Sequence, residues 1–217
     1  YSFARNADDI ADEGDLTRNE RKKLLREIEI NINAIKHQKK IQAPFFRDLE
    51  RVINQYLLDI KLFEQLMSAF KQDVEKKSYR NFNDLITYCN KAACPAGEMI
   101  LSLFDAHNKK NISYSNNLCQ ALALIGMTQD IFEDFLKGRV YIPSTEMKKF
   151  TLKESDIKSK SFNHNWKTFK LPWLTRIELL LNKGRPLGES VTGRLKLQIK
   201  ILIAGADLLV KRLKKED

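Results

Sequence analysis

Apolar residues recur at intervals of three and four along most of this chain. In residues 17–40 this stripe consists of Leu24, Leu25, Ile28, Ile32 and Ile35. The same spacing returns in residues 47–70, 82–104, 116–136, 173–181 and 195–213. It is the spacing of a helix with one buried face, and no useful run alternates with the period of two that a strand requires. The sequence therefore predicts an all-α fold built as a helical bundle.

The small number of glycines and prolines favours a single domain over residues 1–217. Only eight glycines and five prolines interrupt 217 residues, a length that suits one hydrophobic core. Thr17 and Glu20 form a capping box, which predicts a helix start. Residues 140–165 are polar, so we expect a surface connection there with one short helix over 153–159. The first motif follows Tyr1 almost at once, so we expect one or more helices to precede it.

The net charge of +10 suits nucleic acid, an anionic membrane surface or a phosphorylated substrate, and does not choose among them. Much of the excess lies in short clusters, such as residues 21–23 and 211–215, that a solvated helix face explains equally well. No basic and aromatic module of a nucleic-acid binder is recognisable. We therefore expect no nucleic-acid partner.

The cysteines and the hydropathy pattern predict a cytoplasmic protein. Cys89, Cys94 and Cys119 are odd in number and lie outside any metal-ligand spacing, so buried reduced thiols are expected. The chain contains no run of eighteen apolar residues and no signal-peptide pattern at its start.

Two pairs of aspartates are candidate metal ligands. Asp8 and Asp12 lie four residues apart, and so do Asp130 and Asp134, which places each pair on one helix face. Like charges at this spacing repel one another, a cost that a divalent cation between them would offset. Facing pairs in a bundle would form an oxygen-rich site of the kind that Mg²⁺ prefers. A single pair is a weak signal, since solvated helix faces also produce it.

Several segments resemble one protein family. The first is YSFARNADDIADEGD at residues 1–15, followed by AFKQDV at 69–74, YCNKAACPAG at 88–97 and QDIFEDFLKGRVYIP at 129–143. Looser matches, GRPL at 184–187 and GRL at 193–195, follow in the right order. Together they resemble the squalene/phytoene synthases, and among these the bacterial hydroxysqualene synthases. The resemblance implies an all-α bundle of the isoprenoid synthase type.

The resemblance also implies roles for particular residues. Asp8, Asp12, Asp130 and Asp134 would hold the Mg²⁺ ions. Arg5 and Arg139 would contact the diphosphate of the substrate, and Arg5 would share the catalytic role with Tyr1 and Tyr88, which border the reacting carbons. Asp9 and Glu13 would support the metal ligands from one step round the helix. The small residues Ala92, Ala93, Ala96 and Gly97 fit either a channel for an isoprenoid chain or a close helix contact.

Two positions depart from the family pattern. Members usually carry an Asn four residues before the first aspartate of the second motif and a Gln seven residues before it. Here those positions are Gly126 and Ala123. One oxygen donor for the metal is therefore missing, which favours either a depleted site or a non-catalytic homologue. Ser78 also stands where an Arg commonly precedes Tyr79.

The predicted function is Mg²⁺-dependent ionisation of presqualene diphosphate, with water capturing the rearranged cation to give hydroxysqualene in squalene and hopanoid biosynthesis. One alternative is head-to-head joining of two prenyl diphosphates, such as farnesyl diphosphate, to presqualene diphosphate, squalene or phytoene. Another is a non-catalytic homologue that acts in complex assembly. Peripheral association with the inner face of the membrane is a further expectation, although Trp166 and Trp173 are better explained as core residues than as membrane contacts.

Overall fold

The computed structural model describes residues 1–75, 78–159 and 163–215, and within these ranges the regular elements are helices. One isolated bridge pairs Ser78 with Val140. The prediction of an all-α fold is confirmed. Among the described residues, none of the helices has both the length and the apolar character needed to span a membrane.

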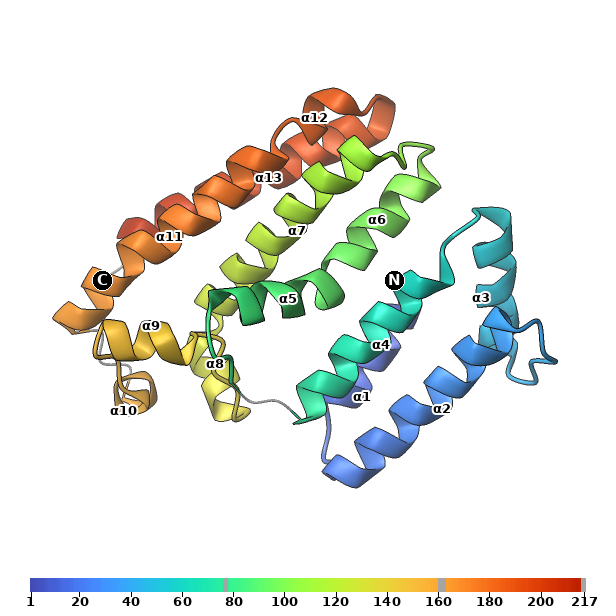
Figure 1. Cartoon of the computed structure of the whole chain (residues 1–217), viewed down its shortest axis with the longest axis horizontal. Coiled ribbons are helices and arrows are strands. Elements are labelled where there is room, and N and C mark those ends of the chain that lie inside the picture. The colour runs from blue at the N-terminus through green and yellow to red at the C-terminus, as the bar shows by residue number, and fades with distance from the viewer. Residues whose placement is uncertain (76–77, 160–162, 216–217) are drawn as a thin grey trace.

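The helices form two groups, each with a hydrophobic core (Figure 1). The first group consists of α1 (Ser2–Asp12), α2 (Arg18–Lys36), α3 (Pro44–Gln55) and α4 (Ile60–Glu75). The second consists of α5 (Phe82–Ala92), α6 (Cys94–Leu103), α7 (Lys109–Gln129), α8 (Ile131–Leu136), α9 (Ser144–Lys149), α10 (Glu154–Lys158), α11 (His164–Gly184), α12 (Leu187–Ser190) and α13 (Gly193–Lys215). Helix α4 contacts both α5 and α6 and so joins the two groups into one domain.

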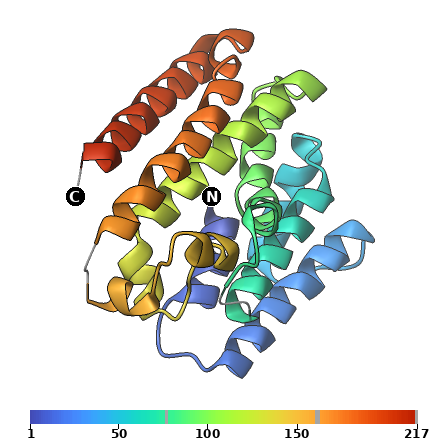
Figure 2. The same ribbon diagram turned by 60° about the vertical axis from the view of Figure 1, so that its left-hand side comes forward.

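Long helices pack side by side in the second group. Helix α11 lies between α7 and α13 and contacts both, as the turned view in Figure 2 shows. Buried residues such as Phe169, Leu174, Ile177 and Leu181 line the face of α11 that these neighbours cover. This layer carries α7, and with it the second aspartate motif, on the side facing the first group.

Three predicted helices are interrupted in the structure. The helix predicted over 47–70 ends at Gln55 and restarts at Ile60, because Leu57 adopts a positive φ of 49°. Neither glycine nor proline marks this break, so the periodic pattern did not reveal it. The helix predicted over 82–104 divides at Ala93, where Pro95 cannot donate the next backbone hydrogen bond. The helix predicted over 116–136 divides at Asp130.

Other boundaries follow the expected capping chemistry. Thr17 and Glu20 form the predicted capping box at the start of α2. Side chains of Asn108 and Asn163 accept backbone N–H groups at the starts of α7 and α11, which therefore begin earlier than the apolar pattern indicated. Side-chain capping thus extends both helices beyond their periodic segments.

The prediction that residues 140–165 form a surface connection is wrong. Ile142, Leu152 and Ile157 are between 1% and 6% exposed and belong to the core of the second group. The short helix predicted over 153–159 is confirmed as α10, and α9 is a further short helix in this segment. Widely spaced apolar residues in a polar segment gave too weak a pattern to predict this burial.

The packing of α11 on α7 depends on Gly184, and this yields a prediction. A Cβ at Gly184 would lie 2.5 Å from the Leu118 Cγ and 2.9 Å from the Leu118 backbone nitrogen. We expect Gly184→Ala to lower the free energy of unfolding by about 1–3 kcal/mol in chemical denaturation. At Gly205 of α13 no atom lies within 4 Å of the position that a Cβ would take, so Gly205→Ala should raise stability by about 0.5–1 kcal/mol. Equal effects of the two substitutions would contradict this account.

Candidate active site

The first aspartate motif lies on one face of α1. Phe3, Ala7 and Ala11 form the buried stripe of this helix, and the ring of Phe3 packs edge-on against Phe63 at 5.1 Å. Asp8 and Asp12 each follow one of the buried alanines, so both lie at the border of the stripe and are half-buried. The alanine spacing therefore turns both carboxylates toward the second group of helices.

Arg5 sits with this motif. Its Nη2 lies 2.7 Å from Asp9 Oδ1 and its Nη1 lies 3.5 Å from Asp8 Oδ2, with about half of the arginine side chain exposed. Arg5 thus partly neutralises its own helix while keeping one side toward solvent. The structure brings Arg5, Asp8 and Asp9 together on α1.

The second motif spans the joint between α7 and α8. Asp130 is both the C-cap of α7 and the N-cap of α8. Its backbone carbonyl accepts the Asp134 backbone N–H at 2.8 Å. Asp130 is exposed. Burial raises the pKa of Asp134 to about 6, against the lowering effect of Arg139, and the charges of Asp130 and Asp12 add to the rise. The influence of Asp12 shows that the two motifs lie within electrostatic reach of each other.

Arg139 joins the two motifs directly. Its Nη2 lies 2.8 Å from Asp12 Oδ2, and both side chains are more than four-fifths buried. Gly138, with a φ of 76°, ends α8 in a left-handed turn, and the Arg139 backbone N–H then bonds to the Asp134 carbonyl at 2.8 Å. This glycine cap aims the guanidinium back across α8 toward α1.

A buried aromatic cluster continues from Arg139. Its Nη1 donates to the Tyr141 hydroxyl at 3.3 Å. The rings of Tyr79, Tyr88 and Tyr141 lie with centroids between 5.4 and 5.9 Å apart. Burial raises the pKa of Tyr141 to about 12 and holds the pKa of Tyr88 well above its ordinary value, so both phenols stay protonated at neutral pH.

Asp73 of α4 closes this network, although neither spacing nor resemblance assigned it a role. Burial raises the pKa of its carboxyl to about 7; a hydrogen bond donated by Tyr88 opposes the rise, and the charge of Asp12 adds to it. The signal was present in the sequence, because Asp73 falls three and four residues after the buried Phe70 and Ala69. A carboxylate on the buried side of an apolar helix is a candidate for function.

The remaining predicted residues lie at the edges. Tyr1 caps the start of α1 and is 99% exposed, outside the tyrosine cluster. Glu13 is exposed and lies 3.8 Å from Lys137, an ion pair that links the end of α1 to the end of α8. Tyr88 is buried within the network.

The small residues of α5 and α6 lie in different surroundings. A Cβ at Gly97 would lie 2.5 Å from Ser115 Oγ and 2.6 Å from Cys119 Sγ, so Gly97 serves a close contact between α6 and α7. Ala96 is exposed, whereas Ala92 packs against the core. On α7, Ala123 and Gly126 are both half-buried, and space is open beyond Gly126.

The residues present fit a magnesium ion by their chemistry. Asp12 Oδ1 is buried and has no hydrogen-bond partner, while its other oxygen binds Arg139. Burial and the charge of Asp12 raise the pKa of Asp8, a destabilised anion that a cation would relieve. Within the described residues, no three or more His, Cys, Asp or Glu side chains stand already grouped to hold a metal. Ligation would thus require the carboxylates to draw together.

A family model described as squalene/phytoene synthase matches residues 1–217. The chain belongs to the squalene/phytoene synthase family. This confirms the predicted family and the prediction of an enzyme of isoprenoid biosynthesis.

Two curated relatives show how similar this chain is to individual enzymes. A hydroxysqualene synthase of Sinorhizobium fredii is 29% identical and aligns with 100% of this chain and 73% of its own length. A phytoene synthase of Mycobacterium tuberculosis is 28% identical over 68% of this chain and 47% of its own length. The chain thus spans about three-quarters of the first protein and about half of the second.

Solved structures support the same assignment. The squalene synthase HpnC of Alicyclobacillus acidocaldarius superposes with a TM-score of 0.90 at 26% identity, covering 99% of this chain and 80% of that protein. A dehydrosqualene synthase in complex with ligand gives a TM-score of 0.80 at 20% identity, which supports the fold alone. The fold predicted from the sequence is therefore confirmed as that of this family.

The raised pKa of Asp73 predicts a pH-dependent stability. Between pH 4 and pH 7 the folded chain keeps a proton on Asp73 that the unfolded chain has lost, so the wild type loses stability as the pH rises. Asp73→Asn cannot lose this proton. In metal-free buffer, the free energy of unfolding of Asp73→Asn minus that of wild type should rise by on the order of 2–4 kcal/mol between pH 4 and pH 8. If urea denaturation gives the same pH dependence of stability for wild type and Asp73→Asn, the Asp73 carboxyl is not buried as described.

Proposed function

We propose that this chain is a Mg²⁺-dependent hydroxysqualene synthase, acting on presqualene diphosphate. The observation that carries the proposal is the ion pair between Arg139 and Asp12, which draws the two aspartate motifs to one site beside a buried Asp73 and its tyrosine cluster. The similarity to named hydroxysqualene synthases over the whole chain supports the choice of reaction.

Binding of the diphosphate is assigned to the motif residues. Arg5 and Arg139 would contact its oxygens, since guanidinium groups pair well with phosphate. Asp8, Asp12, Asp130 and Asp134 would hold Mg²⁺, which when bound neutralises charge on the departing diphosphate. Arg139 would have to exchange part of its contact with Asp12 for the substrate. Asp9 and Glu13 would keep Arg5 and Lys137 in place.

Capture of the cation by water requires a proton acceptor. In the proposed reaction the carbon–oxygen bond to diphosphate breaks, the cation rearranges, and a bond to the oxygen of water forms. The proton released from that water passes to the Asp73 carboxylate, whose pKa of about 7 suits a base at neutral pH. Tyr88 holds the carboxylate by its donated hydrogen bond, and the Tyr79, Tyr88 and Tyr141 rings border the cation with π-electron density.

Two further expectations remain proposals. Tyr1, which is exposed in the structure, would border the reacting carbons only if substrate or further chain covers it. Peripheral association with the inner face of the membrane would suit hydrocarbon-rich substrates and products. Trp166 and Trp173 would not provide that contact, because they are 5% and 3% exposed.

Product identification tests the reaction. The full-length protein with Mg²⁺ and presqualene diphosphate should yield hydroxysqualene, and Asp130→Asn should lower the rate at least about a hundredfold, or about 3 kcal/mol, with little change in stability. Presqualene diphosphate, squalene or phytoene formed from prenyl diphosphates would favour head-to-head joining. If wild type shows no lipid turnover and Asp130→Asn leaves diphosphate binding unchanged, the assembly-factor alternative replaces the enzyme.

The missing oxygen donor on α7 gives a complementary prediction. Space is open beyond Gly126, one helical turn before Asp130, so an asparagine should fit there. We expect Gly126→Asn to lower the Mg²⁺ concentration needed for half-maximal diphosphate binding several-fold, since it adds an oxygen ligand. Gly205→Asn, at an equally open position of α13, is the matched control. An identical Mg²⁺ response in both variants would mean that position 126 does not face the metal.

A further inference from the structure

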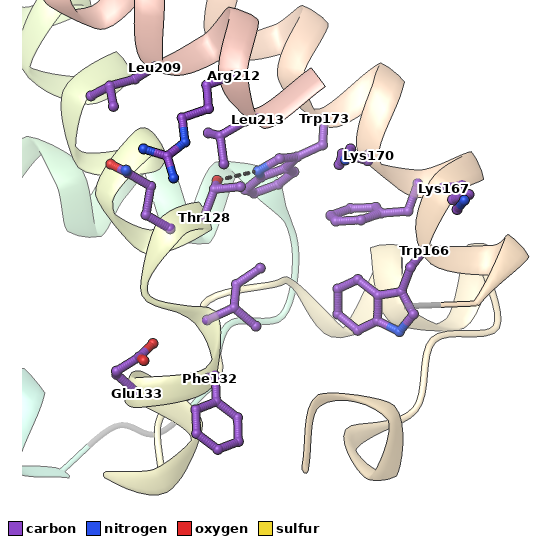
Figure 3. Close-up of a pocket in the computed structure, with 13 residues that line it drawn as sticks. Thr128, Phe132, Glu133, Trp166, Lys167, Lys170, Trp173, Leu209, Arg212 and Leu213 are labelled. Atoms are coloured by element: carbon purple, nitrogen blue, oxygen red, sulfur yellow. Dashed lines mark hydrogen bonds between the residues drawn. The ribbon is translucent and has the colours of Figure 1, made fainter. Parts of the chain in front are cut away.

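A second cavity lies behind the joint that carries Asp130 and Asp134. It has a volume of about 430 Å³ and is bounded by α7, α8, α11 and α13 (Figure 3). Gln129, Ile131, Phe132 and Glu133 line it from the α7–α8 joint, while neither Asp130 nor Asp134 is among its lining residues. The cavity therefore differs from the aspartate site and lies on another side of the same segment.

The interior of this cavity is aromatic. Trp166, Phe169 and Trp173 are at most 5% exposed, and their rings pack with centroids 5.3 and 6.0 Å apart. Trp173 Nε1 donates to Thr128 Oγ1 at 2.9 Å, which fixes the indole against α7. Figure 3 shows Trp166 and Trp173 across the cavity from Phe132, with Leu209 and Leu213 of α13 above. Such a wall suits a hydrocarbon body.

The rim of the cavity is mostly cationic. Lys167 and Lys170 approach from α11 and Arg212 from α13, while Glu133 is the one carboxylate among the lining residues that the structure describes. Lys167 and Arg212 are exposed and Lys170 is half-buried, so the charges lie at the mouth and the aromatic rings deeper. A volume of several hundred Å³, an apolar interior and a few charged groups are typical of a small-molecule site.

We propose that this cavity binds an amphiphile with a hydrocarbon body and a phosphate head. The hydrocarbon would pack on the half-buried Phe132, Leu209 and Leu213, next to the buried tryptophan rings, and the phosphate would contact Lys170 and Arg212. The occupant would touch Thr128, Phe132 and Glu133, which alternate with the second aspartate pair along the α7–α8 joint. The site stands independently of the proposed reaction.

The two tryptophans of the chain provide a specific readout, because both line this cavity. Farnesyl phosphate, titrated in EDTA without Mg²⁺, should change the tryptophan emission saturably. Farnesol and inorganic phosphate, which each lack one half of the ligand, should bind at least about tenfold more weakly. Vesicles of phosphatidylglycerol form a parallel arm that distinguishes a membrane lipid from a free isoprenoid phosphate as the source.

Substitutions separate this site from the aspartate site. Lys170→Gln and Arg212→Gln should each weaken farnesyl phosphate binding about five- to tenfold, whereas the exposed Lys183→Gln of α11 and Lys211→Gln of α13 should not. Asp8→Asn should leave the emission change intact, even if it abolishes turnover.

Three results would overturn the proposal. One is the absence of a saturable response to both farnesyl phosphate and vesicles. Another is loss of the response in Asp8→Asn, which would place the ligand at the aspartates. The third is an emission change that follows protein concentration alone, which would mean that a second copy covers the cavity.

Discussion

The ion pair between Arg139 and Asp12 connects the two groups of helices at the candidate active site. Asp12 belongs to α1, whose buried face is part of the first core, and Arg139 follows α8, whose neighbours form the second. Two mostly buried charges left without each other cost about 3–5 kcal/mol. This contact therefore acts together with the packing of α4 on α5 and α6 to place the two motifs relative to each other.

The local balance of charge explains why the site is poised for a cation. Six carboxylates gather around two arginines, namely Asp8, Asp9, Asp12, Asp73, Asp130 and Asp134 with Arg5 and Arg139. Mutual repulsion and burial accordingly raise the pKa of Asp8, Asp73 and Asp134. The overall charge of +10 resides elsewhere on the surface. Positive charge there can attract an anionic substrate toward the site.

Periodicity predicted the fold well because a stripe of Leu and Ile at helical spacing has few alternative uses. It could not predict the break at Leu57, which depends on a backbone conformation without a glycine or proline signal. The aspartate pairs were found from their spacing and from the family resemblance. Asp73 and Tyr141 gained a role only in three dimensions, because their partners lie on other segments far along the chain.

The two aspartate pairs have the same spacing in sequence but lie in different structural contexts. Asp8 and Asp12 share one continuous helix, so their spacing is fixed by its backbone. Asp130 and Asp134 lie across a helix joint, and Asp130 is exposed while Asp134 is half-buried. A joint can change its angle at lower cost than a helix can bend. The spacing of the first pair is therefore set by one helix, and that of the second pair by the angle between α7 and α8.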